Sequence, residues 1–472
     1  MEHTRKYSIY HKEPAGVRDI LGTTKTLEYP LGERLPLFLW PVHDAIVEDV
    51  SHQRQIVENL IGHGVAVISK WQWKKKEKTL ADGLRVARIQ KDLGLHVCID
   101  ATRVMYGFFN GDSSTAHLDD QGNPFFDSSI PSGRIGCPFR IDHRYESMRK
   151  QIEFFVSAYK QEGLQIDMVW GDWEIDGPLE INRAWEAAKR CAVCRKRIPH
   201  LDKFEAFQDA VRVKRAEATR LCYTDPILSR FPSALVGNYA VYPHDGFRYW
   251  YDYFEDFIEY HPHHLDQLAP CRRWYHEFEL TNYTFAMPVA YPWARLYGWY
   301  NYENSDFRWF YNMLRVGSNA AAHTRFDIPL IPFVHYQTIY EPDPGDSTIK
   351  QMSTSAYQEL LWHLILRGCD SLFLWCLPEQ NTREVPLIHK VWAESLRYTK
   401  WLNKGIPITF DVPNQIIPVI SGLRVGNQVL VRRTDFNDTT GTPVQIRVAD
   451  GMLTVPADPG QCQILGLDAC DA

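Results

Sequence analysis

Short apolar runs alternate with segments of helical periodicity from residue 37 to about residue 400. Short runs that are apolar on both faces are typical of strands buried in a parallel sheet. We predict strands at Leu37–Trp40, Val65–Lys70, Leu95–Asp100, Ile166–Asp172, Ala234–Tyr239, Phe285–Ala290, Leu330–His335 and Ser371–Cys376. The periodic segments between them predict helices at Asp49–Ile61, Leu80–Leu93, Arg144–Tyr159, Asn182–Cys191, Phe307–Val316, Ala356–Leu366 and Ile388–Leu402.

Strand–helix units in succession favour an α/β fold of the (β/α)8 TIM-barrel type, in which functional residues lie at the carboxyl ends of the strands. The competing architecture is a doubly wound open sheet, which usually has a glycine-rich turn after its first strand. The residues after Trp40 are Pro-Val-His-Asp, without a glycine. We therefore predict a catalytic barrel over residues 37–404, preceded by an N-terminal extension at residues 1–36.

From Pro407 onward the pattern changes to alternation with period two, interrupted by Gly and Asp turns. Gln428–Arg433 and Pro443–Val448 alternate in this way. Such alternation indicates antiparallel strands with one buried face. We predict a small C-terminal antiparallel β-sandwich at residues 405–472.

Composition and charge narrow the classes of partner. The formal net charge is −6, whereas nucleic-acid binding requires clustered Lys and Arg, so we expect no nucleic-acid partner. No stretch approaches the roughly 20 apolar residues of a membrane span, so we expect no membrane partner. The polar N-terminus has no apolar signal segment, which predicts a cytoplasmic protein, or a secreted or periplasmic one if a signal has been removed.

The sequence does not predict a metal or a cofactor. Ten cysteines in 472 residues do not form a disulfide scaffold. Cys191-Ala-Val-Cys194 has the CxxC spacing, but no second pair follows as a zinc ribbon would require. We interpret it as two helix cysteines, with a local disulfide or half of a metal site as alternatives. His261-Pro-His-His264 is interpreted as a surface loop.

The carboxyl ends of the predicted strands carry polar and aromatic side chains. Aromatic faces stack on the C–H faces of sugars, and polar groups bind hydroxyls, so such a set suits a carbohydrate. The candidates for substrate binding are Trp40, Lys70, Trp71, Asp100, Trp170, Asn238, Tyr239, Trp293, His335, Tyr336 and Trp375. We expect an oligosaccharide or polysaccharide as the partner.

The fourth predicted strand runs from apolar residues into carboxylates, as Asp167-Met-Val-Trp170-Gly-Asp172-Trp-Glu174-Ile-Asp176. Alternate side chains of a strand share a face, so Trp170, Asp172 and Glu174 point the same way. The spacing resembles the fourth-strand motif of glycoside hydrolase family 18 chitinases, Asp-x-x-Asp-x-Asp-x-Glu, and its Asp-Trp-Glu core is similar to that of hyaluronidases. It departs from the chitinase motif at Trp170, which replaces an Asp, and at Met168, which replaces a Gly.

The resemblance implies a retaining glycoside hydrolase. Glu174 would be the general acid, and Asp172 would orient the 2-acetamido group of the substrate, which attacks in place of an enzyme carboxylate. Trp375 would form the floor of the sugar subsite. Tyr291 is the sixth-strand candidate for contacting the acetamido group, although the Met-x-Tyr-Asp pattern of that strand is not matched.

Three alternatives remain at this point. A glycosidase with two enzyme carboxylates would use Asp172 as nucleophile, as in α-galactosidases and α-fucosidases, with an acid from Glu174, Asp245 or Glu341. A non-catalytic sugar-binding barrel is disfavoured, because Glu174 is present. A structural protein would use the aromatic residues as core.

Overall fold

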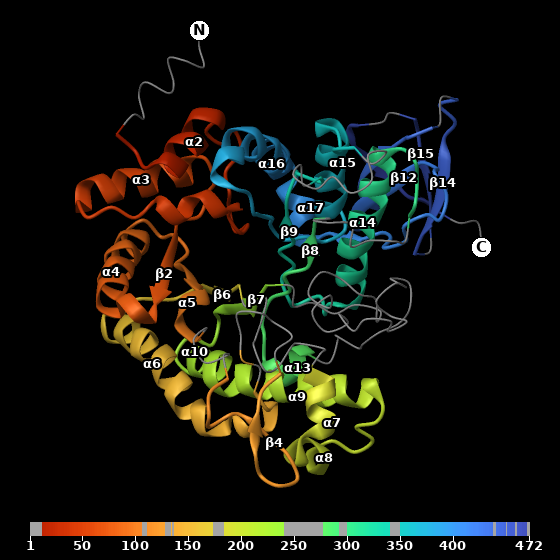
Figure 1. Ribbon diagram of the computed structural model, residues 1–472. Coiled ribbons are helices and arrows are strands. Elements are labelled where there is room, and N and C mark those ends of the chain that lie inside the picture. The colour runs from red at the N-terminus through yellow and green to blue at the C-terminus, as the bar shows by residue number, and fades with distance from the viewer. Residues whose placement is uncertain are drawn as a thin grey trace. The chain divides into compact units, whose positions relative to one another are not determined.

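The computed structural model describes residues 12–105, 111–127, 134, 136–172, 184–239, 277–291, 300–339, 350–437, 440–449, 451–457 and 460–469 (Figure 1). The chain divides into two compact units. Unit 1 comprises residues 1–45, 51–67 and 286–472, and unit 2 comprises residues 46–50 and 68–285. None of the helices described in either unit combines the length and the apolar character of a membrane span.

Unit 2 contains a parallel sheet with the strand order β2-β3-β6-β7. Its strands are β2 (Ile68–Gln72), β3 (Cys98–Ala101), β6 (Met168–Gly171) and β7 (Leu235–Asn238). Lys70, Asp100, Trp170 and Gly237 are in register across the sheet. Residues in register on parallel strands point to the same side, so these four positions share one face, which we call the inner face of this sheet.

Two long helices cover the other face of this sheet, α4 (Lys76–Asp92) and α6 (Tyr145–Gln161), and both lie along the same side of unit 2 in Figure 1. Trp71 points to them: its ring stacks on Phe155 of α6 with centroids 5.1 Å apart and planes 10° apart. Gly83 of α4 allows a close approach, because a Cβ there would lie 2.3 Å from Oη of Tyr159. Aromatic side chains therefore fill the space between this face of the sheet and the two helices.

The connections after β3 and β6 carry small elements of their own. These elements are α5 (Thr102–Met105), β4 (His117–Leu118), β5 (Pro124–Phe125), η4 (Pro138–Arg140), η5 (Asp142–Arg144), α7 (Ala184–Arg190), α8 (Ala192–Arg197), α9 (Phe204–Thr219), η7 (Arg220–Thr224) and α10 (Asp225–Leu228). Residues of both connections share one hydrophobic cluster, which includes Cys137, Phe204 and Phe207. The described parts of these two connections thus form a packed substructure. Helix α13 (Glu277–Thr281) follows later in unit 2.

Unit 1 contains a second parallel sheet, with the order β1-β10-β9-β8. Its strands are β1 (Phe38–Leu39), β8 (Val289–Ala290), β9 (Phe333–Val334) and β10 (Phe373–Leu374). Phe38, Phe373, Phe333 and Val289 are in register. The Phe333 and Phe373 rings lie 4.9 Å apart. One face of this sheet therefore carries an apolar layer that is mostly aromatic.

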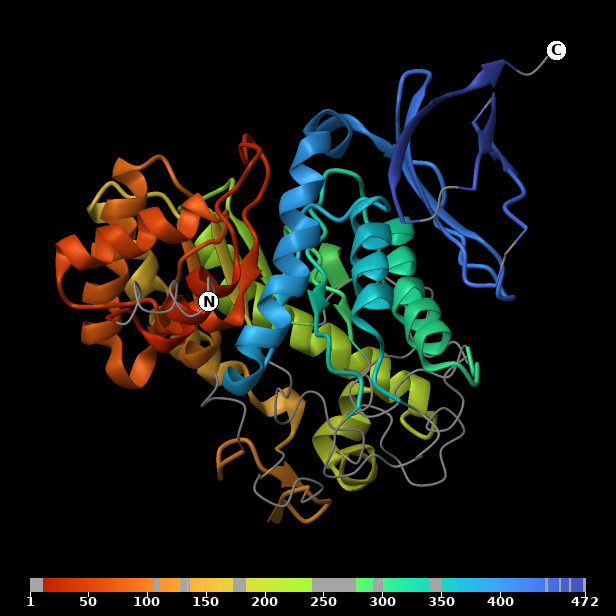
Figure 2. The same cartoon turned by 90° about the horizontal axis from the view of Figure 1, so that it is seen from above.

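Helices of unit 1 pack beside this sheet. They are α2 (Ala15–Thr23), η1 (Trp40–Asp44), α3 (Val50–Gly62), α14 (Ser305–His323), α15 (Thr354–Ile365), η9 (Pro378–Gln380), α16 (Asn381–Ser395), η10 (Leu396–Tyr398) and α17 (Thr399–Lys404). Helices α14, α15 and α16 pack in sequence order (Figure 2). The Asn304 side chain caps α14 by accepting from the amides of Asp306 and Phe307. The Ser353 hydroxyl caps α15 and also donates to Asp306 over 2.6 Å, which ties the two helix starts together.

The C-terminal part of unit 1 is antiparallel, as the alternating sequence predicts. One sheet has the order β11-β12-β13-β16 and another the order β14-β15-β17. The strands are β11 (Ile406–Pro407), β12 (Val419–Val425), β13 (Gln428–Thr434), β14 (Val444–Val448), β15 (Gly451–Val455), β16 (Cys462–Gly466) and β17 (Asp468–Ala469). Val429 and Val431 of the first sheet and Leu453 and Val455 of the second belong to one buried cluster.

Buried polar contacts join this part to α15. Nδ1 of His363 lies 2.7 Å from the Ser421 hydroxyl of β12, and its Nε2 lies 2.9 Å from the Thr434 hydroxyl of β13. Arg432 of β13 pairs with Glu359 of α15. Burial lowers the pKa of His363 well below its usual value, because a charged imidazole would lose its hydration there. The histidine therefore acts as a neutral hydrogen-bonding bridge.

Each strand predicted in the first 400 residues has a shorter counterpart in the structure, and the fold is a mixed α/β fold with parallel sheets. The helical stretch predicted at Ile388–Leu402 is confirmed but begins earlier, at Asn381, and the 3-10 turn η10 separates α16 from α17. Pro386 lies inside α16. Closure into one barrel, the sandwich, and the domain boundaries at residues 37 and 405 stay predictions.

Candidate functional site

Aromatic rings lie at the carboxyl ends of the strands of unit 1, two residues beyond the layer that contains Phe333 and Phe373. Tyr291, His335, Trp375 and Trp40 each follow the strand residue that ends β8, β9, β10 and β1. The Tyr291 and Trp375 rings are stacked, with centroids 6.0 Å apart and planes 19° apart. His335 meets both rings edge-on, at 5.7 Å from Tyr291 and 5.0 Å from Trp375. The amide of Trp375 donates to the Val334 carbonyl over 3.0 Å, so the parallel register continues up to this layer.

Behind His335 lies a carboxylate that the sequence analysis did not select. Nδ1 of His335 is 3.0 Å from Oε2 of Glu384, and both side chains are 0% exposed. The same Oε2 accepts the backbone N–H of Tyr336 over 2.9 Å. The guanidinium of Arg383 lies 3.6 Å from Oε1 of Glu384. Glu384 therefore fixes both the imidazole and the backbone that follows it.

The signal for Glu384 was present in helix α16. Asn381, Val385, Ile388 and Trp392 are buried positions of this helix, and Glu384 falls within the same stripe. An acidic residue in an inward stripe is almost never fully buried unless it is paired. The sequence thus indicated a buried partner for Glu384, but not which one, because His335 lies far away along the chain.

The Tyr336 side chain is buried and is not available to a ligand. It is 6% exposed, its ring lies 5.3 Å from that of Tyr357, and the Arg383 guanidinium lies over it at 5.5 Å. Burial raises the pKa of Tyr336, an effect that Arg383 partly offsets. Among the predicted residues of unit 1, Tyr291, His335 and Trp375 are thus in mutual ring contact, and the Trp40 ring meets Phe333 of the layer below edge-on at 6.5 Å.

The strand ends of unit 2 carry charges instead of rings. Lys70 and Asp100 are in register on the inner face. Oδ1 of Asp100 accepts the backbone N–H of Thr102 over 2.9 Å. The Thr102 hydroxyl in turn accepts the backbone N–H of Asp172 over 2.9 Å. Thr102 therefore links the ends of β3 and β6.

Asp100 is the described carboxyl at these strand ends with a displaced pKa. Burial raises its pKa, because an ionised carboxylate loses hydration at 6% exposure. The hydrogen bonds from Thr102 and the charges of Lys70 and Arg103 lower it in part. A carboxyl of this kind retains its proton to a higher pH than a free aspartate and can donate a hydrogen bond or a proton.

Alternation along the strands sorts the other predicted residues of unit 2. Tyr239 lies on the inner face with Asp100, and its amide donates to the Gly171 carbonyl over 2.8 Å. Trp170 is on the same face, one layer below Asp172, and is fully buried. Asn238 falls on the face that carries Trp71, which packs against α6. Trp71 and Asn238 therefore lie on the helix side of the sheet and are not part of the candidate site.

Several sequence candidates fall outside the described residues. These are Glu174, Trp293, Asp176, Asp245, Glu341 and the histidines of residues 261–264. The first acid of the motif is described and has a structural role. Oδ2 of Asp167 accepts the Val97 amide over 2.7 Å at the amino end of β6.

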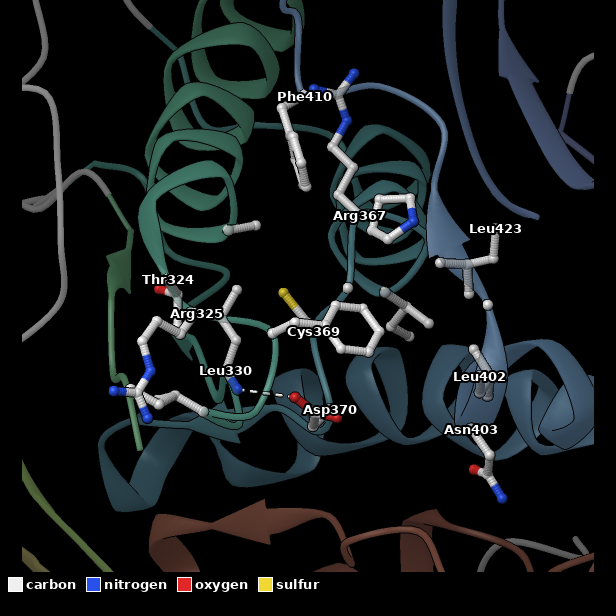
Figure 3. A pocket seen from close by; sticks show the side chains of 17 residues that line it. Thr324, Arg325, Leu330, Arg367, Cys369, Asp370, Leu402, Asn403, Phe410 and Leu423 are labelled. Carbon is white, nitrogen blue, oxygen red and sulfur yellow. Dashed lines mark hydrogen bonds between the residues drawn. The ribbon is translucent and has the colours of Figure 1, made fainter. Parts of the chain in front are cut away.

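A cavity of about 200 Å³ in unit 1 lies at the opposite ends of the strands (Figure 3). Leu330 and Asp370, which line it, precede β9 and β10, and the Leu330 amide donates to Asp370 over 2.8 Å. In parallel α/β folds, residues at the amino ends of the strands serve stability rather than catalysis. This cavity is therefore separate from the aromatic rings at the carboxyl ends of the same strands.

No family model matches the chain. Among solved structures, the chain is similar to α-L-fucosidase isoenzyme 2 from Paenibacillus thiaminolyticus, with a TM-score of 0.44, 11% identity, and coverage of 80% of this chain and 51% of that chain. It is also similar to a GH36 α-galactosidase from Geobacillus stearothermophilus, with a TM-score of 0.42, 11% identity, and coverage of 96% and 58%.

A third similar structure is a glycoside hydrolase family 30 subfamily 8 xylanase from Clostridium acetobutylicum, with a TM-score of 0.35, 11% identity, and coverage of 89% of this chain and 86% of that chain. The chain thus spans between half and three fifths of the length of the first two proteins. All three carry glycoside hydrolase names. The resemblance to family 18 stays a prediction.

Proposed function

We propose that the protein is a glycoside hydrolase that acts on an oligosaccharide or polysaccharide at the carboxyl ends of its parallel strands. The observation that carries the proposal is the arrangement of Lys70, Asp100 and Asp172 in unit 2. Lys70 and Asp100 are in register on neighbouring parallel strands, Asp172 directly follows β6, and Thr102 links Asp100 to Asp172. Glycosidic cleavage requires carboxyl groups with different protonation held side by side, and strand ends are where α/β folds place such groups.

The proposal includes a (β/α)8 barrel. In each sheet the strand order follows the chain without a reversal, as β2-β3-β6-β7 and as β8-β9-β10-β1 when it is read in a circle. A doubly wound sheet reverses its strand order at a switch point. The observed order supports a barrel.

In the first mechanism, Glu174 protonates the leaving oxygen and the 2-acetamido oxygen of the substrate attacks the anomeric carbon. Glu174 lies two residues beyond Asp172, so continued alternation would place both on the inner face. Asp172 would hold the acetamido group through its N–H. In unit 1, the half-buried Trp375 would be suited to stack on a sugar face.

A second mechanism is supported by the raised pKa of Asp100. In this case Asp172 attacks the anomeric carbon, and a protonated carboxyl, Asp100 or Glu174, donates to the leaving oxygen. Water then hydrolyses the glycosyl–enzyme bond and restores both carboxyl groups. The substrate needs no acetamido group in this mechanism.

The test is a panel of aryl glycosides with and without a 2-acetamido group. Turnover that is confined to acetamido sugars supports substrate assistance, and turnover of plain hexosides or fucosides supports the two-carboxylate mechanism. Glu174→Gln should lower kcat by about 10³-fold, the typical contribution of a general acid. Asp176→Asn, a matched change in the same segment, should leave kcat close to that of the wild type.

One result would contradict the proposal, and another would exclude the first mechanism. If no glycoside is turned over although oligosaccharides bind, the protein is a sugar-binding barrel. If Glu174→Gln retains full activity while Asp100→Asn loses it, Glu174 is not the acid and Asp100 takes its place.

A further inference from the structure

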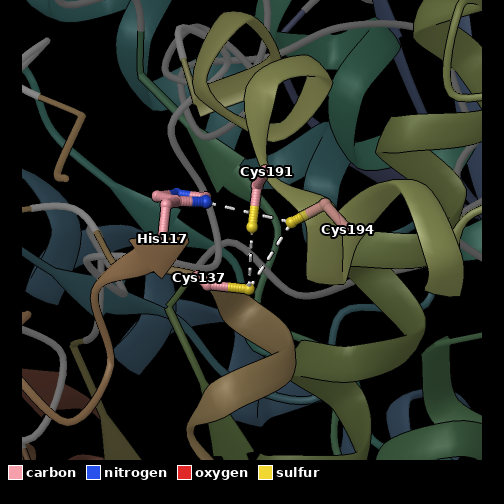
Figure 4. Close-up of side chains that lie close together, drawn as sticks. All are labelled: His117, Cys137, Cys191 and Cys194. Atoms are coloured by element: carbon pink, nitrogen blue, oxygen red, sulfur yellow. Dashed lines mark hydrogen bonds between the residues drawn. The ribbon is translucent and has the colours of Figure 1, made fainter. Parts of the chain in front are cut away.

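Four side chains of unit 2 that the proposed function does not use converge in the substructure built from its two long connections (Figure 4). They are His117 of β4, Cys137 just before η4, Cys191 at the start of α8, and Cys194 within α8. All four are buried, and their ligand atoms lie within 4.8 Å of one another. Three sulfurs and an imidazole nitrogen thus face one point in the interior.

The distances between these atoms match a tetrahedral metal centre. Bonds of about 2.3 Å from zinc to sulfur and about 2.0 Å to nitrogen place two sulfurs about 3.8 Å apart, and a sulfur and a nitrogen about 3.5 Å apart. Sγ of Cys137 lies 3.5 Å from Sγ of Cys194 and 4.0 Å from Sγ of Cys191. Nδ1 of His117 lies 3.9 Å from Sγ of Cys194. The four atoms surround a space of the size of one zinc ion.

The backbone holds the ligands in place from both connections. The Cys137 amide donates to the Thr115 carbonyl over 2.7 Å. Residue 136 must be glycine for this approach, because a Cβ there would lie 2.6 Å from the Thr115 carbonyl oxygen. The Arg195 amide donates to the Cys191 carbonyl over 3.0 Å, which starts the turn that brings Cys194 beside Cys191.

The orientation of His117 is also fixed. Its ring stacks on Phe125, with centroids 5.2 Å apart and planes 20° apart. The guanidinium of Arg190 covers the Phe125 ring at 4.7 Å. With the ring held in this way, Nδ1 points at the thiols. A fully buried imidazole nitrogen aimed at three thiols has no role in an apolar core, but it is what a metal centre requires.

We infer that His117, Cys137, Cys191 and Cys194 bind one Zn²⁺ ion as a Cys3His site. Three thiolates and one imidazole are the donor set that favours zinc over magnesium or calcium. Because the four protein ligands complete a tetrahedron, no position remains for water or substrate, and the site is structural. A disulfide is the competing arrangement for two of the thiols, but it requires sulfurs about 2.05 Å apart.

A zinc ion at this site would stabilise the packing of the β3–β6 connection against the β6–β7 connection. The β3–β6 connection supplies His117 and Cys137, and the β6–β7 connection supplies Cys191 and Cys194. The zinc would therefore cross-link two segments that are far apart in the sequence, beside the shared cluster of Phe204, Phe207 and their neighbours. The second connection also contains Glu174 in sequence.

The first experiment uses the full-length wild-type protein, expressed in zinc-supplemented medium and purified without chelators. Elemental analysis should find about one zinc per chain. Titration with a mercurial that modifies thiols should release that zinc, measured with a colorimetric zinc indicator. Replacement of the zinc by Co²⁺ should give a thiolate-to-cobalt charge-transfer band and the intense d–d bands of tetrahedral coordination. These measurements do not depend on whether any variant folds.

The second experiment compares variants. Cys137→Ser and Cys194→Ser should lower the bound zinc at least several-fold. Cys222→Ser is the matched control: this buried thiol of the same unit contacts the Tyr145 carbonyl at 3.5 Å, outside the cluster, and it should retain one zinc per chain. The inference is overturned if the wild type takes up neither zinc nor cobalt, if mass spectrometry finds Cys137 and Cys194 joined as a disulfide, or if the cluster variants keep their zinc.

Discussion

The two parallel sheets have four strands each, and they differ in the side chains at and near the carboxyl ends of their strands. In unit 1, an apolar layer with Phe333 and Phe373 is followed by the rings of Tyr291, His335 and Trp375. In unit 2, the corresponding strand ends carry Lys70 and Asp100, followed by Asp172. A sheet tolerates buried charges only where they meet donors or opposite charges. Unit 2 supplies these through Lys70 and the Thr102 amide, whereas unit 1 encloses its carboxylate, Glu384, behind His335.

The comparison separates two roles. Rings provide contact area with little dependence on pH, while carboxyl groups with displaced pKa values provide proton transfer. We therefore expect changes at the strand ends of unit 1 to act on stability and substrate affinity, and changes at those of unit 2 to act on kcat and on the pH dependence.

The largest effect on stability is expected at the buried pair of unit 1. Glu384→Ala removes the acceptor of the Tyr336 amide and the contact with Nδ1 of His335. Leaving a buried polar group without its partner costs about 1–3 kcal/mol, and two groups lose theirs here, so the total cost should be about 2–6 kcal/mol. We expect the free energy of unfolding, measured by urea denaturation, to fall by that amount.

Two controls accompany this change. Glu384→Gln keeps an acceptor oxygen and should cost about 1–2 kcal/mol. Glu379→Ala removes an exposed carboxylate from the neighbouring η9 and should leave stability unchanged. Equal stability of the Glu384→Ala and Glu379→Ala proteins would show that the pair at the end of β9 does not support this sheet.

A smaller effect, on affinity, is expected at the stacked rings. Trp375→Ala removes one side of the Tyr291–Trp375 stack. The lost contact area should raise KM for the best substrate about tenfold, equivalent to about 1.4 kcal/mol, with kcat changed much less. Trp375→Phe should recover part of the loss. A fall in kcat at constant KM would instead place this residue in the chemical step and remove the distinction between the two sheets.

The sequence predicted the strands well because buried parallel strands have a strong local signal. It also placed Trp170 and Asp172 on one face, since alternation needs no tertiary information. Lys70 and Trp71 were both selected because they lie near a strand end. Neighbouring residues of a strand cannot share a face, and Trp71 packs against Phe155 on the helix side.

The remaining features depend on contacts between distant segments. Glu384 was visible as a charge in an apolar stripe, but its partner His335 was not. A zinc site at Cys191 and Cys194 was judged from the sequence by whether a second cysteine pair follows them, and none does. Their partners, His117 and Cys137, come earlier in the chain and do not form a pair in sequence. No local pattern predicts that β4 and α8 lie side by side.

The smallest effect expected is a pH dependence of stability at the end of β3. Burial raises the pKa of Asp100, so the folded protein holds this proton to a higher pH than the unfolded chain, where an aspartate titrates near 3.9. The resulting stabilisation is complete below that value and is lost as the pH rises through the folded-state pKa. The side-chain amide introduced by Asp100→Asn would be neutral throughout, and its oxygen can accept the same Thr102 amide.

The thermal midpoint of Asp100→Asn relative to the wild type should therefore increase between about pH 4 and pH 8. Asp112→Asn provides the opposite case in the same unit. Hydrogen bonds from Ser114 lower the pKa of Asp112 to about 2, so its difference from the wild type should stay constant over this range above about pH 5 and change only in more acidic solution. A flat difference for Asp100→Asn would mean that Lys70 and Thr102 fully offset its burial. The carboxyl would then be ionised like any other, and the acid in the two-carboxylate mechanism would have to be Glu174.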